Sequence, residues 1–161
     1  MSPTRNYARQ VIELARTRGV MIATAESCTG GLIAGALTDI AGSSAVVDRG
    51  FITYSNAAKM EMLEVPPETL HAHGAVSRQT AMAMAQGALT HSQADLTVSV
   101  TGVAGPGGGS VDKPVGLVWF GLAQSGKPVR ATSRKFGNVG RERVRELTVE
   151  QALKLLIGAL S

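Results

Sequence analysis

Several residue types that mark specialised classes of protein are scarce in this sequence. Cys28 is the one cysteine in 161 residues, so no internal disulfide can form, and neither a second thiol nor a histidine pair gives it zinc-site spacing. Aromatic residues are few, at one Trp, two Tyr and three Phe, and no dense basic run accompanies the formal net charge of +4. We therefore expect no metal and no nucleic-acid partner.

Long apolar runs are also absent. The chain begins with the polar segment Ser2-Pro3-Thr4-Arg5, which predicts neither a signal peptide nor a membrane span and therefore a cytoplasmic protein. Hydrophobic residues make up 44% and charged residues 17% of the sequence, a balance typical of compact globular proteins. At this length we expect residues 1–161 to form a single domain with an ordinary core.

The spacing of apolar residues predicts both helices and strands. Helices are expected over residues 4–18, 32–37, 55–63, 77–91 and 139–160, and strands over residues 20–24, 46–54, 96–100, 115–123 and 129–136. Pro66 and Pro67 must end the helix that precedes them. The last two strands form a hairpin, which makes the sheet mixed. Because helices both precede and follow the strands, we predict an α/β fold, a three-layer α/β/α sandwich around a mixed sheet of about five strands.

The first candidate site is the turn between the first strand and the second helix. A hydroxyl in this position lies where free backbone N–H groups can stabilise an oxyanion or bind a phosphate, so Ser27 is a candidate nucleophile. Equally, Ser27 or Thr29 can serve only as a helix cap, with Gly30 and Gly31 permitting a tight turn. Cys28 is a rival nucleophile, although lone cysteines are more often inert packing residues.

A nucleophilic serine needs a base. His71, His73 and His91 lie in a turn region and at a helix end, where we expect all three to be surface residues. Lys59 is better placed, because it falls in the first turns of a helix that Ser55 can cap. There the helix dipole disfavours a second positive charge, and burial would lower the pKa of Lys59 further. A neutral lysine amine can accept the serine proton; the alternative is an exposed helix lysine.

The second candidate site is the glycine-rich loop from Thr101 to Ser110. Its glycines let main-chain N–H groups approach an anion closely. The loop does not match the phosphate-binding pattern G-x-x-x-x-G-K-[ST], and it leads into a strand where a dinucleotide fingerprint would open a helix. Both of those interpretations are excluded, and the alternative to an anion site is a flexible connection without function.

The remaining charged residues define no further site. Asp39, Asp48, Asp95 and Asp112 are scattered, with neither metal-ligand spacing nor a paired-acid arrangement. Positive charges gather late in the chain, at Arg130, Arg134, Lys135, Arg141, Arg143 and Arg145. Such a cluster indicates either an anionic small-molecule partner or a solvated helix face.

Several separate motifs, in order, carry a resemblance to a known family. They are residues 24–31 (TAESCTGG), 50–56 (GFITYSN) with Lys59, 74–77 (GAVS), 101–108 (TGVAGPGG) with 113–116 (KPVG), and Phe136 with Gly140, Arg141 and Arg145. Over nearly its whole length the chain resembles the C-terminal domain of the CinA (competence/damage-inducible) family, which is also found as stand-alone nicotinamide-nucleotide amidohydrolases.

The resemblance implies hydrolysis of the carboxamide of nicotinamide mononucleotide to nicotinate mononucleotide and ammonia, a step in recycling pyridine nucleotides, without metal or cofactor. It implies Ser27 as the nucleophile, Lys59 as its base and Tyr54 as a group that orients or relays the proton. The substrate-binding positions that it implies are Cys28, Thr29, Gly30, Gly31, Thr101, Gly102, Gly105 and Arg141, with Arg143 and Arg145 as alternatives to Arg141 for the phosphate. It also implies a homo-oligomer, most simply a dimer, to which the apolar stretch Leu153 to Leu160 can contribute.

Two other classes of function stay open. A nucleotide-binding or regulatory module would keep the fold and the anion site without turnover. A nucleic-acid accessory protein is suggested only by the positive charge and by the competence name of the family.

Overall fold

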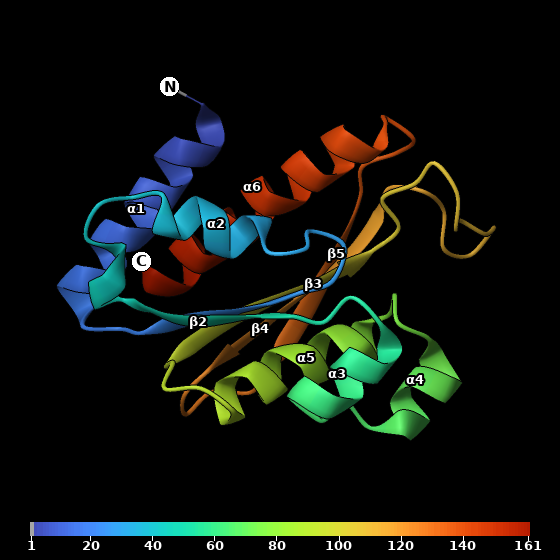
Figure 1. Ribbon diagram of the computed structural model, residues 1–161, viewed down its shortest axis with the longest axis horizontal. Coiled ribbons are helices and arrows are strands. Elements are labelled where there is room, and N and C mark those ends of the chain that lie inside the picture. The colour runs from blue at the N-terminus through green and yellow to red at the C-terminus, as the bar shows by residue number, and fades with distance from the viewer. Residues whose placement is uncertain (1) are drawn as a thin grey trace.

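The computed structural model describes residues 2–161, and its five strands form one mixed sheet in the order β2-β1-β3-β4-β5 (Figure 1). The strands are β1 (Ile22–Glu26), β2 (Val47–Ile52), β3 (Leu96–Gly102), β4 (Leu117–Gln124) and β5 (Arg130–Lys135). β1 pairs in parallel with β2 and β3, whereas β4 is antiparallel to β3 and to β5. The predicted mixed sheet is confirmed.

Helices cover both faces of this sheet (Figure 1). On one face lie α1 (Pro3–Arg18), α2 (Leu32–Thr38) and α6 (Arg141–Leu160). On the other lie α3 (Asn56–Leu63), α4 (Pro67–His73) and α5 (Arg78–Thr90), and a short 3₁₀ helix η1 (Ser43–Ala45) leads into β2. The predicted three-layer α/β/α sandwich is therefore confirmed as well.

The core divides into two apolar clusters, one on each face of the sheet. Leu63 and Met84 belong to the cluster under α3 and α5. Leu153, Leu156 and Leu160 belong to the larger cluster under α1, α2 and α6, and all three are buried. Burial of each such side chain contributes about 1.5–3 kcal/mol. These three leucines of the apolar stretch at the C-terminus are thus used inside the chain and are not available to a second copy.

Helix α4 is an α-helix that the sequence analysis missed. α3 ends at Leu63, as expected, but Pro67 then opens a new helix instead of merely stopping the old one. The first residue of a helix needs no backbone N–H, so proline is well suited to it. The expectation that His71 and His73 lie in a turn region is therefore wrong, because both are on α4. Their predicted exposure is confirmed, as is that of His91.

Two strand boundaries differ from the prediction in ways that matter for the site. β1 begins and ends two residues later than expected, so Glu26 is its last residue and Ser27 follows directly. β3 continues to Gly102. Pairing between strands even extends past their ends, because Thr53 N–H donates to Glu26 O (2.9 Å) and Ser27 N–H donates to Val100 O (3.0 Å).

The direction of the strands places the candidate residues at one edge of the sheet. The carboxyl ends of the three parallel strands meet at this edge, and the connections after β1 and β2 run over opposite faces (Figure 1). Ligands bind at such an edge in open α/β sheets. The turn between β4 and β5 lies at the opposite edge, where Ser125 N–H donates to Asp95 O (2.9 Å) just before β3 begins.

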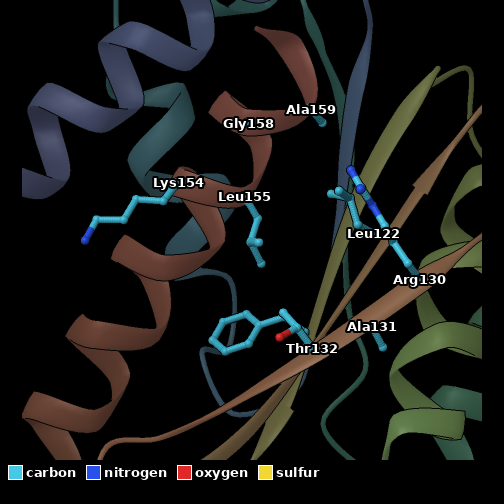
Figure 2. Close-up of a pocket in the computed structure, with 9 residues that line it drawn as sticks. Leu122, Arg130, Ala131, Thr132, Lys154, Leu155, Gly158 and Ala159 are labelled. Carbon is cyan, nitrogen blue, oxygen red and sulfur yellow. The ribbon is translucent and has the colours of Figure 1, made fainter.

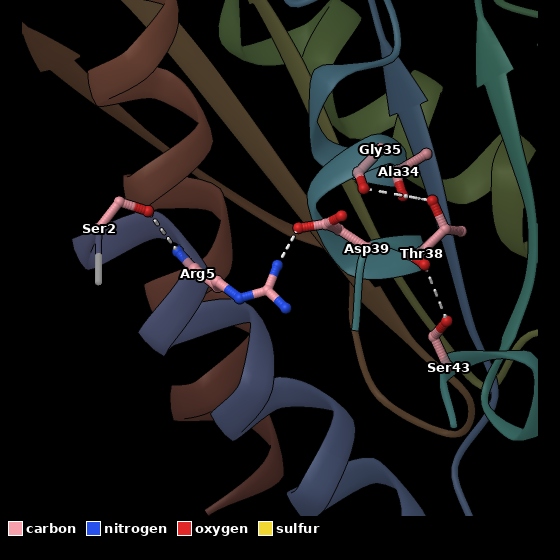
Figure 3. A network of polar contacts seen from close by, with 7 residues as sticks. All are labelled: Ser2, Arg5, Ala34, Gly35, Thr38, Asp39 and Ser43. Carbon is pink, nitrogen blue, oxygen red and sulfur yellow. Dashed lines mark hydrogen bonds and ion pairs between the residues drawn. The ribbon is translucent and has the colours of Figure 1, made fainter. Parts of the chain in front are cut away.

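Polar contacts tie α1 to the end of α2 on the outer surface (Figure 3). Ser2 caps α1 by accepting from Arg5 N–H (3.2 Å), and the Arg5 guanidinium forms an ion pair with Asp39. Thr38 and Ser43 continue the contacts, with Ser43 Oγ donating to Thr38 O (3.4 Å). Within residues 2–161, every helix is too short or too polar to cross a lipid bilayer.

Gly121 generates a prediction about stability, because α5 packs on β4 at this residue. Ser99 Oγ accepts from Gly121 N–H (3.1 Å) and donates to Ala81 O (2.6 Å), and a Cβ on Gly121 would overlap both oxygens. We expect Gly121→Ala to lower the free energy of unfolding by about 1–3 kcal/mol, measured by urea denaturation. Gly158→Ala is the control, since Gly158 lies in α6 with open space around it and should gain about 0.5–1 kcal/mol. Equal effects of the two substitutions would contradict the packing argument.

Candidate active site

A pocket of about 300 Å³ opens at the edge where the parallel strands end. It is formed by the turn after β1, the start of α3, residues 75–76, the glycine loop and the first residue of α6. The residues predicted from the sequence that line it are Ser27, Tyr54, Lys59, Cys28, Thr101, Gly102, Gly105 and Arg141. Segments far apart in the chain therefore meet at one cavity.

Lys59 and Ser27 are in hydrogen-bond contact inside this pocket. The Nζ of Lys59 lies 3.0 Å from Ser27 Oγ, and it also donates to the carbonyl oxygens of Thr53 (2.9 Å) and Tyr54 (3.2 Å). A neutral amine has two N–H bonds and one lone pair. With both N–H bonds on the two carbonyl oxygens, the lone pair is left for the Ser27 hydroxyl proton.

Burial lowers the pKa of Lys59. Its side chain is 1% exposed, so the alternative of an exposed helix lysine is excluded. Desolvation of the ammonium form is the largest cause of the downward pKa shift, as it disfavours the charged form of any buried amine. The geometry and the pKa shift both favour an amine that can accept a proton from Ser27.

Cys28 is poorly suited to be the nucleophile. It is 5% exposed, and burial raises the pKa of its thiol from 9.0 to about 11. The thiolate is the reactive form of cysteine, so this thiol stays protonated near neutral pH.

Arg141 connects three parts of the pocket wall. Its guanidinium donates through Nη1 to Gly105 O (2.8 Å) and through Nη2 to the Tyr54 hydroxyl (3.1 Å). Gly105 can present its carbonyl in this way because its φ of 84° is left-handed, a conformation that favours glycine. The Tyr54 phenol therefore contacts Arg141, while only its backbone carbonyl contacts Lys59. The Arg141 guanidinium is a cation at the pocket, and no carboxylate is among the described residues that line it.

Two other polar side chains line the same pocket. The Thr101 hydroxyl donates to Ala75 O (2.8 Å), which fixes the segment before α5 against the end of β3. Asn56 was missed by the sequence analysis, although the signal was present. It stands three residues before Lys59 on one helix, and residues at that spacing share a face.

The expected substrate-binding residues Thr29, Gly30 and Gly31 do not line the pocket, and the start of α2 binds an internal carboxylate. Glu26 is 1% exposed and accepts from Ile33 N–H and Ala34 N–H, both at 2.9 Å. It also accepts from the hydroxyls of Thr29 (2.6 Å) and Thr24 (3.1 Å). Those two helix N–H groups are therefore already paired with an anion that belongs to the protein.

The backbone of this turn still offers donors beside Ser27. Gly30 N–H donates to Ser27 O (3.1 Å), and Ser27 N–H is paired with β3. Among the described residues, the N–H groups of Cys28 and Thr29 have no backbone partner.

The three arginines near the start of α6 have different surroundings. Arg141 lines the pocket, whereas Arg143 forms an exposed ion pair with Glu146 (3.0 Å). Arg145 lies on the same face of α6 as Arg141 and donates to the carbonyl oxygens of Cys28 (3.1 Å) and Thr29 (3.2 Å). Arg141 is thus the one of the three whose side chain is at the pocket.

A separate cavity of about 450 Å³ lies between α6 and the strands β4 and β5 (Figure 2). Leu155 points from α6 toward the strands, while Lys154 points away from them. The cavity is lined by none of the predicted site residues. It also lacks a nucleophile next to a base, so the smaller pocket is the candidate active site. In residues 2–161, no group of three or more His, Cys, Asp or Glu side chains is arranged to hold a metal ion.

The fold and the pocket define an α/β protein with a buried serine-lysine pair in a cationic site at the carboxyl edge of its sheet. The chain belongs to the CinA C-terminal domain family, whose model matches residues 4–160.

Relatives and solved structures agree with this membership. The chain is 48% identical over 155 residues to the nicotinamide-nucleotide amidohydrolase PncC of Escherichia coli (strain K12), covering 96% of this chain and 93% of that protein. It is 52% identical over 146 residues to a putative competence-damage inducible protein of Caldicellulosiruptor bescii, covering 91% of this chain but only 35% of that longer protein. The crystal structure of a competence/damage inducible protein from Agrobacterium tumefaciens superposes with a TM-score of 0.96 at 55% identity, over 99% of this chain and 96% of that one.

The pKa of Cys28 gives a prediction that needs no substrate. At pH 8 a thiol with a pKa of about 11 has roughly a hundredfold less thiolate than one with a pKa of 9.0. We expect iodoacetamide to alkylate Cys28 at least that much more slowly in the native protein than in urea, measured by intact mass. The native rate should rise with pH up to about 11. Rapid alkylation of the native protein at pH 8 would contradict the burial and the raised pKa of this thiol.

Proposed function

We propose that this chain is a nicotinamide-nucleotide amidohydrolase, which converts nicotinamide mononucleotide and water to nicotinate mononucleotide and ammonia. The observation that carries the proposal is the 3.0 Å contact between Lys59 Nζ and Ser27 Oγ in a pocket that the Arg141 guanidinium lines and that has no acidic lining residue among those described. The name of the Escherichia coli relative, which this chain matches over almost its whole length, supports the choice of substrate.

In the proposed reaction Ser27 is the nucleophile and Lys59 the general base. Neutral Lys59 takes the hydroxyl proton as Ser27 Oγ attacks the carboxamide carbon, and a tetrahedral oxyanion forms. The same proton then passes to the leaving nitrogen, the C–N bond breaks, and ammonia departs from an ester intermediate. Water attacks this ester with Lys59 again as the base, which releases the carboxylate product and restores Ser27.

The reaction involves two negative charges, the tetrahedral oxyanion and the phosphate of the substrate, and a separate group of hydrogen-bond donors is available for each. For the oxyanion we propose the N–H group of Cys28, because Cys28 directly follows the nucleophile and lines the pocket, and this N–H has no backbone partner among the described residues. For the phosphate we propose Arg141 together with the N–H groups of the glycine loop. A guanidinium can bind two phosphate oxygens at once, and Arg141 would exchange its present partners for them.

In this scheme Tyr54 does not relay a proton. Its hydroxyl is held by Arg141, so we propose that the phenol orients the phosphate-binding guanidinium. Its carbonyl oxygen helps to hold the Lys59 amine toward Ser27.

The location and the assembly of the protein are also matters of proposal. We propose that the protein acts in the cytoplasm and assembles as a homodimer. Because three leucines of the C-terminal stretch are buried in the chain's own core, a dimer interface would use other surfaces.

The central prediction concerns turnover. The purified protein should release ammonia from nicotinamide mononucleotide, and Ser27→Ala should lower kcat by about 10³-fold or more, because the nucleophile is lost. Ser44→Ala, which removes an exposed hydroxyl in η1, and Cys28→Ala should retain most of the activity. An equal rate for wild type and Ser27→Ala would overturn the catalytic proposal. Tight nucleotide binding without product would instead favour a regulatory module.

The lowered pKa of Lys59 predicts an acid limb in the pH profile. Only the neutral amine can accept the Ser27 proton, and it predominates above its pKa. As pH falls through that pKa, kcat/KM should fall tenfold per pH unit. Lys59→Arg keeps a charge that cannot be removed and should abolish turnover at every pH. A flat acid limb in the wild type would be incompatible with Lys59 as the base.

A further inference from the structure

The turn that carries Ser27 is held from two sides by charged side chains that do not line the pocket. On the side of β1 and α2, the Glu26 carboxylate accepts from the Thr29 hydroxyl (2.6 Å) and from two N–H groups of α2. On the side of α6, Arg145 donates through Nε to Cys28 O (3.1 Å) and through Nη2 to Thr29 O (3.2 Å). Thr29 is therefore bound by an anion through its hydroxyl and by a cation through its carbonyl.

The contacts of Arg145 fix two successive peptide groups. The planar guanidinium presents its N–H bonds as a rigid fork, so it can hold both carbonyls in one geometry. In a trans peptide the C=O and the following N–H point in opposite directions. By holding the Cys28 carbonyl, Arg145 also sets the direction of the Thr29 N–H, which has no backbone partner among the described residues.

The charge of Arg145 also matters at this position. Glu26 places a buried carboxylate one residue before the nucleophile, where it opposes any further negative charge. Arg145 lies on the other side of the turn and offsets it. Both charges act on the pKa of the Cys28 thiol. Burial has the largest effect on this pKa; beyond it, the Glu26 charge raises the pKa and the Arg145 charge lowers it.

We propose that Arg145 is a positioning residue for the Ser27 nucleophile: by binding the Cys28 and Thr29 carbonyls it fixes the backbone of the turn that carries Ser27 and Cys28, and its charge balances the Glu26 carboxylate. This inference rests on the proposed function. Arg145 does not touch the substrate; it acts through the backbone beside Ser27. The competing explanation is that Arg145 only fastens α6 to the sheet.

Steady-state kinetics separate these two explanations. Arg145→Gln should lower kcat by about 10²-fold, as much as the loss of one oxyanion donor, because the turn that carries Ser27 and the Cys28 N–H is no longer held, while KM changes less than about threefold. The unfolding temperature should stay within a few degrees of wild type, because α6 keeps its buried apolar face. Arg143→Gln is the matched control on the same helix, since Arg143 forms an exposed ion pair with Glu146 away from the turn, and its kcat should equal that of wild type.

Arg145→Lys tests whether the planar guanidinium, and not only its charge, is needed to hold the two carbonyls. Lysine keeps the positive charge but presents it as a point, so it cannot hold two carbonyls in the same plane. We expect a kcat between those of wild type and Arg145→Gln. A kcat equal to wild type would overturn the orientation part of the proposal.

A second readout does not depend on the identity of the substrate. A sulfonyl fluoride reacts with an activated serine by forming an O–S bond and breaking the S–F bond, and fluoride leaves with the hydroxyl proton. Labelling of Ser27, followed by intact mass, should be at least tenfold slower in Arg145→Gln than in wild type or Arg143→Gln. Its pH midpoint should be unchanged, because Lys59 is untouched.

The labelling outcome decides the inference separately from the proposed function. Labelling of Arg145→Gln at the wild-type rate, together with a large fall in unfolding temperature, would show that Arg145 only fastens α6 and would overturn the proposal. If the wild type is labelled at Ser27 but releases no ammonia from nicotinamide mononucleotide, the proposed substrate is wrong, and slower labelling of Arg145→Gln still supports the positioning role.

Discussion

The structure of the site depends on the burial of one lysine amine. Removing an amine from water is costly unless its hydrogen-bonding groups are satisfied, and here the carbonyls of Thr53 and Tyr54 satisfy them. These carbonyls are free because β2 ends at Ile52 and the chain then leaves the sheet. α3 begins at Asn56, after the Ser55 cap, and Lys59 is its fourth residue. The Lys59 side chain therefore reaches back to the carbonyls that follow β2. The edge of the sheet thus positions both the amine and its partners.

The three arginines at the start of α6 have different contacts because of the period of the α-helix. Arg141 and Arg145 are four residues apart on α6 and share a face, whereas Arg143 between them points elsewhere. One face therefore supplies both the guanidinium at the pocket and the guanidinium on the Ser27 turn. The glycine loop and the nucleophile turn are both held by the first turns of a single helix, so a shift of α6 would alter both together.

The sequence was sufficient for the fold and for the residues whose role depends on their place in an element. The pattern of strands and helices predicted the sandwich. The strand-turn-helix position of Ser27 and the capped helix of Lys59 made both residues candidates, and the family resemblance implied that they act as the pair that the structure brings together. Contacts between distant residues were not accessible in this way. Nothing local shows that Glu26, in an apolar strand, accepts from N–H groups seven and eight residues later, or that Arg145 reaches Cys28 across 117 positions. α4 is not evident from the sequence because Pro66 and Pro67 predict the end of one helix, whereas Pro67 also begins the next.

The turn between β4 and β5 is on the edge of the sheet away from the pocket, and its tip at Ser125, Gly126 and Lys127 is exposed. A hairpin of this kind tolerates added residues, because its ladder is closed by the two strands and its tip packs against nothing that the site requires. An affinity peptide, a fluorescent protein or a surface-attachment sequence inserted there would leave the entrance of the pocket open to solvent. The same location offers a point for joining this chain to a second protein.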